Sequence, residues 1–171
     1  GITDQFVLGH VGNFCYQKNH YFLLDVFEEV HKKDPNTVLL LAGDGVRFEK
    51  VRQIVAEKNL EDVVKLLGRR SDTDYLYQGM DAFLLPSNFE GLPIAGIEAQ
   101  SAGLPCFMSD EITKESKITE ACYFIPLKSG AKYWAEEILD NRIERQSAEF
   151  LDNAEQYDLA NQDQELKSLI R

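Results

Sequence analysis

The chain has 171 residues, 44% of them hydrophobic, which suffices for one core within the size range of an ordinary single domain. Its formal charge is −11 and it contains no block of Lys or Arg, so neither nucleic acid nor anionic lipid is expected as a partner. Three widely spaced cysteines without metal-ligand spacing, and no apolar run of roughly 18 residues, indicate a cytoplasmic protein with reduced thiols and no membrane span.

Continuously apolar runs, typical of strands buried on both faces, alternate along the chain with amphipathic helical runs. The predicted strands cover 6–12, 37–43, 62–68 and 81–87, and further apolar runs cover 104–109 and 122–127. The predicted helices cover 20–33 after the N-cap Asn19, 47–59, a stretch after the cap Ser71, a stretch beginning at Pro93, and 131–139. This order predicts an α/β fold with a doubly wound, Rossmann-like parallel sheet.

The composition of the chain changes near residue 140. Residues 1–140 are predicted to form the α/β domain, whereas residues 141–171 are polar and rich in amides. The second stretch is therefore predicted to be a helical carboxyl-terminal appendix of the same domain.

Ligands of such sheets bind beyond the carboxyl ends of the strands, so the loop before Pro93 is a candidate site. Pro93 suits the first turn of a helix, whose free amides favour an anion, and Gly91 has no Cβ to keep a ligand away. Glu90 and Glu98 flank this helix start, and carboxylates accept strong hydrogen bonds from hydroxyls. A ligand with both phosphates and sugar hydroxyls, such as a nucleotide-sugar, fits each feature.

Two other phosphate motifs fit less well. Gly91 and Gly96 have the spacing of a P-loop, but Ile97 and Glu98 stand where that loop requires Lys and Ser or Thr. The run GDGVRF has only the first two glycines of a dinucleotide-binding fingerprint. NAD binding therefore stays an alternative that only part of this motif supports. The three histidines have no spacing typical of a catalytic base and are interpreted as structural.

A family resemblance is carried by three runs, which are GHVGNFCYQKNHYFLLDVF, LLLAGDG and LLGRRSDTDYLYQGMDAFLLPSNFEGLPIAGIEAQSAGLP. Over about residues 7–126 the chain resembles the carboxyl-terminal, nucleotide-binding half of GT-B, family-4-type retaining glycosyltransferases. It looks closest to bacterial exopolysaccharide and capsule enzymes. The resemblance implies transfer of a hexosyl group from a nucleoside diphosphate to an acceptor hydroxyl, with the anomeric configuration kept.

The resemblance also implies roles for individual residues. Glu98 would hold the ribose, and Glu90 would contact the donor sugar and act in catalysis together with Lys18, which neutralises the diphosphate. Members of the family usually have a second cation at the position that Asn13, next to Gly12, occupies here. This difference removes one positive charge from the residues that would hold the diphosphate, here called the diphosphate clamp. The backbone of the residues between the two glutamates would meet the sugar or diphosphate, and these residues are Gly91, Leu92, Pro93 and Ile94. The loop of Gly68 and Arg69 would receive the base.

The resemblance further implies a donor such as a UDP-sugar, no cofactor and no metal. A saccharide or lipid-linked saccharide acceptor would bind through a missing amino-terminal domain, at the inner face of the membrane if the protein is peripheral. The isolated chain is accordingly predicted to be inactive in transfer. Two alternatives stay open: a non-catalytic nucleotide-sugar-binding module, which Asn13 motivates, and a UDP-sugar epimerase of related fold.

Overall fold

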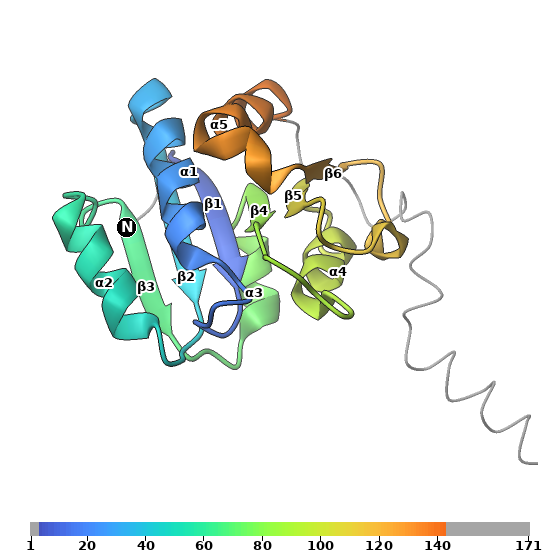
Figure 1. Ribbon diagram of the computed structural model, residues 1–171, viewed down its shortest axis with the longest axis horizontal. Helices are drawn as coiled ribbons and strands as arrows, with labels where there is room; N and C mark the ends of the chain where they lie inside the picture. The colour runs from blue at the N-terminus through green and yellow to red at the C-terminus, as the bar shows by residue number, and fades with distance from the viewer. Residues whose placement is uncertain (1–3, 143–171) are drawn as a thin grey trace, which may run out of the picture.

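A computed structural model describes residues 4–142 (Figure 1). The predicted helical appendix lies outside the described residues apart from its first two positions, so it stays a prediction. The strands are β1 (Phe6–Val11), β2 (Thr37–Ala42), β3 (Val64–Gly68), β4 (Ala82–Leu85), β5 (Cys106–Ser109) and β6 (Cys122–Ile125). The α-helices are α1 (His20–Lys33), α2 (Phe48–Glu57), α3 (Thr73–Gln78), α4 (Ile94–Ser101) and α5 (Gly130–Asp140), with short 3₁₀ turns at Lys114–Ser116 and Leu127–Ser129.

The strands form one six-stranded sheet in the order β3-β2-β1-β4-β5-β6, and every neighbouring pair is parallel. The predicted doubly wound, Rossmann-like fold is therefore confirmed. The strand order reverses between β1 and β4, and this switch point is where α/β sheets of this kind open a crevice for ligands.

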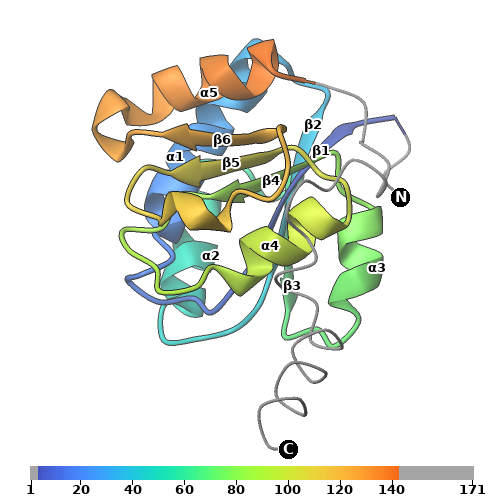
Figure 2. The same ribbon diagram turned by 90° about the vertical axis from the view of Figure 1, so that its right-hand side faces the viewer.

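Helices cover both faces of the sheet, which explains why the strands are apolar at successive positions (Figure 2). One core joins α1, α2 and α5 to strand residues such as Leu8 and Leu84, and Trp134 is fully buried in it. The second core joins α3 and α4 to residues of the opposite face, such as Phe83 and Leu85. Figure 2 shows α5 on one side of the strands and α4 on the other.

Two predicted helix starts were wrong by one residue, and the start of α1 was predicted correctly. Asn19 precedes α1 in the left-handed conformation, with φ 55°, and its side chain makes no capping hydrogen bond. The residue before α3 is Asp72 rather than Ser71. Pro93, with ψ 70°, lies just outside α4, which begins at Ile94. All three helices are present, and α1 covers the predicted residues 20–33.

A close backbone approach joins the loops after β1 and β2. Gly43 has φ 139°, and a Cβ at this position would lie 1.9 Å from the carbonyl oxygen of Gly12. Only glycine fits here, because it tolerates this conformation and leaves room for the neighbouring loop. The approach fixes the loop that follows β1 on one side of the switch point.

Within residues 4–142, no helix is both long enough and apolar enough to span a membrane.

Candidate functional site

The loops after β1 and β4 lie side by side at the switch point (Figure 2). The backbone N–H of Asn88 donates to the carbonyl oxygen of Gln17 at 2.8 Å, and the Asn88 side chain donates to the carbonyl oxygen of Tyr16 at 2.7 Å. These bonds align the two loops although they are far apart in the sequence. Residues predicted from separate motifs therefore meet at one edge of the sheet.

Glu90 is the centre of the contact between these loops. Its Oε1 accepts hydrogen bonds from Lys18 Nζ and Ser87 Oγ, both at 2.7 Å, and its Oε2 accepts one from Gln17 Nε2 at 2.8 Å. The side chain of Glu90 is only 4% exposed and that of Lys18 is 15% exposed. The structure thus brings together the two residues predicted to be catalytic, as a largely buried ion pair.

This ion pair leaves capacity for a ligand. An ammonium group has three N–H donors, and Lys18 uses one of them on Glu90, so two can still meet phosphate oxygens. A carboxylate oxygen has two acceptor positions, and Glu90 Oε2 uses one for Gln17, so one position is left for a hydroxyl. The pair can therefore contact a phosphate and a sugar at the same time.

The loops after β2 and β3 are tied to the same edge. Phe14 N donates to Asp44 O at 2.9 Å, and Gly43 N donates to Gly68 O at 2.8 Å. Gly12 lies beside Lys18, because a Cβ on Gly12 would be 3.2 Å from Lys18 Cε. The loops after β1, β2, β3 and β4 therefore form a continuous edge.

Asn13 and Arg69 are both exposed at this edge. Among residues 4–142, no carboxylate pairs with the guanidinium of Arg69, whereas Arg70 pairs with Asp72 through Nε at 2.8 Å. Gly68 has φ 64°, and a Cβ there would meet no atom within 4 Å. The structure thus leaves open space at the loop predicted to receive the base.

The segment before α4 is open on its outer side. A Cβ on Gly91 would meet no atom within 4 Å, and Leu92 and Ile94 are 54% and 61% exposed. Pro93 is buried. The Ile94 amide donates to Leu92 O at 3.0 Å, so this amide already has a partner within the chain. Contact with a ligand through Gly91 stays compatible with the geometry, but the predicted role of the Ile94 amide is weakened.

Glu98 is an exposed residue in the second turn of α4. Its Oε2 accepts a hydrogen bond of 2.8 Å from the hydroxyl of Tyr77, a side chain of α3 that is only 3% exposed. Burial, together with the charge of Glu98, raises the pKa of Tyr77 well above its usual value, so the hydroxyl stays protonated and donates.

Two buried histidines lie beneath the loop after β1. His10 Nδ1 is 2.8 Å from Leu84 O, and the His20 ring stacks on Phe14 with centroids 4.0 Å apart. Burial lowers the pKa of His10 to about 4 and that of His20 to about 2, so both rings are neutral at pH 7. Their positions agree with the structural role expected for them.

Three residues of the site were missed in the sequence: Gln17, Ser87 and Tyr77. Each acts through a hydrogen bond to a glutamate that is at least three residues away, and two of these bonds join different loops or helices. No local pattern marks Gln17 or Tyr77, because their contacts exist only once the sheet is assembled. Ser87 is three residues from Glu90, so the spacing of the two residues could have indicated this contact.

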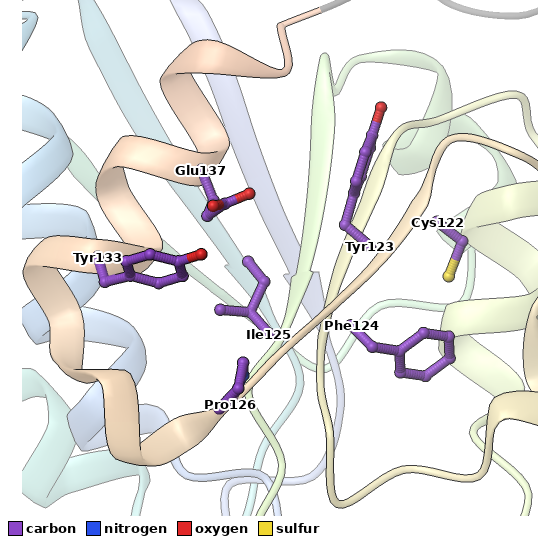
Figure 3. Close-up of a pocket in the computed structure, with 7 residues that line it drawn as sticks. All are labelled: Cys122, Tyr123, Phe124, Ile125, Pro126, Tyr133 and Glu137. Atoms are coloured by element: carbon purple, nitrogen blue, oxygen red, sulfur yellow. The ribbon is translucent and has the colours of Figure 1, made fainter.

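A separate pocket lies between β6 and α5, away from the switch point (Figure 3). Figure 3 shows Tyr133 and Glu137 projecting from α5 toward the side of β6 that carries Ile125, while Phe124 points the other way. The charged residue that lines this pocket is Glu137, and no Lys or Arg lines the pocket. A diphosphate would be repelled there, which leaves the switch point as the better candidate for an anionic ligand.

The parallel sheet and its covering helices define a Rossmann-like α/β domain, the fold found in GT-B glycosyltransferases. The profile of the family described as glycosyl transferases group 1 matches residues 1–160. The chain belongs to this family.

Named relatives agree with this assignment. The chain is 32% identical over 169 residues to the capsular polysaccharide biosynthesis glycosyltransferase CapH of Staphylococcus aureus, covering 94% of this chain and 46% of CapH. It is 34% identical over 110 residues to the UDP-Gal:alpha-D-GlcNAc-diphosphoundecaprenol alpha-1,3-galactosyltransferase of Escherichia coli, covering 63% of this chain and 28% of that enzyme.

Solved structures of the same fold are also known. Anabaena Alr3699/HepE in complex with UDP and glucose superposes with a TM-score of 0.79 at 19% identity, over 99% of this chain and 49% of that protein. At this identity the likeness concerns the fold. The chain spans less than half the length of each of these three proteins.

Proposed function

We propose that this chain is the nucleotide-sugar-binding domain of a retaining, family-4-type glycosyltransferase of polysaccharide biosynthesis. The observation that carries the proposal is the buried pair of Lys18 and Glu90 at the switch point of the sheet, with Glu98 on the adjoining helix. Family membership favours glycosyl transfer over sugar epimerisation. The E. coli relative is named for a UDP-sugar, and the Anabaena structure contains UDP, which supports a uridine nucleotide as donor.

In this proposal Lys18 stabilises the negative charge that grows on the departing diphosphate, which is where preorganised cations contribute most. Glu98 accepts hydrogen bonds from the ribose, and Glu90 accepts one from the donor sugar through Oε2. The acceptor hydroxyl attacks the anomeric carbon on the face that the leaving diphosphate occupies, and the diphosphate assists removal of the hydroxyl proton. The bond to the diphosphate breaks as the new glycosidic bond forms, so configuration is retained without a protein nucleophile.

Exposed apolar side chains surround this site. Tyr16, Val46, Phe89, Leu92 and Ile94 are each more than half exposed, and all lie in segments at the carboxyl edge of the sheet. Such clustering marks a surface that a partner covers. We assign this surface to a preceding α/β domain of the longer protein, which would bring a saccharide or lipid-linked saccharide acceptor at the cytoplasmic face of the membrane.

A non-catalytic binding module is the second candidate, and Asn13 favours it. The exposed, neutral Asn13 leaves the diphosphate clamp with one cation fewer than the family usually provides. A weaker clamp lowers leaving-group stabilisation more than it lowers binding, since catalysis depends on charge that develops in the transition state.

A labelled-donor assay tests the proposal. The longer protein, with its preceding domain, is incubated with UDP-[14C]sugars and oligosaccharide or lipid-linked acceptors, beside the 171-residue chain alone. We expect transfer by the longer protein and none by the chain alone, because orientation of two substrates contributes about 7–11 kcal/mol to such reactions. Nucleotide binding without transfer by the longer protein would favour the binding module, and turnover by the short chain would contradict the two-domain account.

A further inference from the structure

The two glutamates of the site are held in different ways. Glu90 is nearly buried and accepts hydrogen bonds from three side chains. Glu98 is exposed, and within the described part of the chain the one hydrogen-bond partner of its carboxylate is the hydroxyl of Tyr77, at 2.8 Å. An exposed glutamate ordinarily samples several rotamers, so this contact is what fixes the direction of the Glu98 carboxylate.

Tyr77 itself is rigid. Its side chain is 3% exposed in the core between α3, α4 and the sheet, and its ring lies edge-on to Phe83 with centroids 5.8 Å apart. Ala95 O lies 3.4 Å from the same hydroxyl, on the turn of α4 that precedes Glu98. The hydroxyl is therefore held in place from the core side and directed at the first two turns of α4.

The contact leaves the other oxygen of Glu98 available. Within residues 4–142, Oε1 of Glu98 has no hydrogen-bond partner, and Oε2 keeps one acceptor position beside the Tyr77 bond. Three acceptor positions therefore remain in the fixed plane of the carboxylate, which is enough for two neighbouring hydroxyl donors, such as those on the 2′ and 3′ carbons of a ribose.

We propose that Tyr77 is a positioning residue that orients Glu98 for the vicinal hydroxyls of the nucleotide ribose and so sets a preference for ribose over deoxyribose. The inference rests on the proposed function, because it requires a nucleotide at this edge of the sheet. Tyr77 does not touch the nucleotide and acts only through Glu98. Without the Tyr77 hydroxyl, the ligand itself must order the Glu98 side chain. Binding then becomes less favourable by the cost of immobilising one flexible side chain.

The experiment compares the affinities of UDP, 2′-deoxy-UDP and pyrophosphate for wild type and Tyr77→Phe by calorimetry. We expect Tyr77→Phe to weaken UDP about three- to tenfold and to reduce the preference of UDP over 2′-deoxy-UDP. Pyrophosphate affinity should stay as in wild type, because the loop that carries Lys18 is unaffected. A general structural defect would weaken pyrophosphate as well, and that result would overturn the positioning role.

Tyr75→Phe is the matched control. Tyr75 lies on the same helix two residues earlier and is 74% exposed, so its substitution should leave all three affinities unchanged. In a Glu98→Gln background, Tyr77→Phe should cause little further loss, since both substitutions act on one contact. If Tyr77→Phe does not fold, Glu98→Asp serves instead, because its shorter side chain cannot keep the same contact with Tyr77. It should lose the ribose preference, and a full preference in this variant would contradict the inference.

Failure of the inference is distinguishable from failure of the proposed function. If wild type binds no nucleotide at millimolar concentration, the proposed function itself is wrong. A second set of results has a different meaning: wild type prefers UDP over 2′-deoxy-UDP, Glu98→Gln removes this preference, and Tyr77→Phe retains it in full. In that case the proposed function stands and the proposed role of Tyr77 is wrong.

Discussion

Lys18 and Glu90 are 72 positions apart in the sequence, yet Nζ of Lys18 lies 2.7 Å from Oε1 of Glu90. The pair joins the loop after β1 to the loop after β4 at the point where the strand order reverses. It therefore both stabilises the crevice and places a cation and a carboxylate where a ligand enters. These two roles lead to separate predictions.

The first prediction concerns stability. Glu90→Gln leaves Lys18 without its buried counter-charge and disturbs the bonds from Gln17 and Ser87, so it should lower the free energy of unfolding by about 1–3 kcal/mol. Glu57→Gln is the control, because the Glu57 carboxylate is exposed and pairs with Lys50 only at 3.9 Å; it should cost less than about 0.5 kcal/mol. Urea denaturation measures both, and equal losses would show that the buried pair does not stabilise the crevice.

The second prediction concerns the backbone approach of the loops after β1 and β2. Gly43→Ala introduces a Cβ against Gly12 O at a φ of 139°, so we expect a loss of about 2 kcal/mol or more in unfolding free energy. Gly79→Ala is the matched control, since its φ is −90° and a Cβ there meets its nearest neighbour at 3.6 Å. Thermal or urea unfolding compares the two, and a well-tolerated Gly43→Ala would mean that the loops are free to separate.

The third prediction concerns pH. The pKa of His20 is about 2 in the folded protein, against an ordinary value of 6.5, so between these values the unfolded chain binds a proton that the folded protein does not. Stability attributable to His20 is therefore complete above pH 6.5 and falls as pH decreases, by about 2 kcal/mol at pH 5. His20→Phe keeps an aromatic ring beside Phe14 and removes this proton uptake.

The loss of unfolding free energy between pH 7 and pH 5 should accordingly shrink by about 2 kcal/mol in His20→Phe. Guanidinium denaturation of wild type and variant at the two pH values measures the difference. His10, with a pKa of about 4, continues to contribute in both proteins, so some pH dependence should persist. An unchanged pH dependence in the variant would contradict the burial of a neutral His20.

Much of the fold could be predicted from the sequence, because continuous apolar runs of strand length and amphipathic helices are local patterns. The helix starts were less accurate. Asn19 stands at the N-cap of α1, as its residue type predicts, but it is in the left-handed conformation and its side chain makes no capping hydrogen bond. Pro93 fits a first turn, but the chain enters α4 one residue later, where the loop after β4 is held by the loop after β1.

The candidate site was predictable in part. Lys18, Glu90 and Glu98 stand in recognisable spacing, and the structure places the first two in contact. The residues that orient them were not predictable, because Gln17 and Tyr77 reach their glutamates across the sheet edge and between helices. Their side chains belong to ordinary helical and loop patterns, in which a tyrosine on an apolar face predicts only a core residue.

The fourth prediction concerns the missing cation. Asn13 is exposed at the switch point, so Asn13→Arg should add a charge that meets the diphosphate and should tighten UDP more than uridine. Gln53→Arg adds the same charge on the exposed face of α2 and controls for the change in net charge. Calorimetry with both ligands measures the effect. Equal effects of Asn13→Arg on UDP and uridine would place position 13 away from the diphosphate.

The most direct test of a diphosphate site at the switch point is isothermal titration calorimetry of UDP with wild type, Lys18→Met and Lys33→Met. Lys33 is the control, because it lies in the last turn of α1, pairs with Glu136, and carries the same charge as Lys18. We expect wild type and Lys33→Met to bind UDP equally, and more tightly than uridine, whereas Lys18→Met should lose about tenfold or more in UDP affinity. Absence of UDP binding to wild type at millimolar concentration, or equal affinities of the two variants, would contradict a diphosphate site at the switch point.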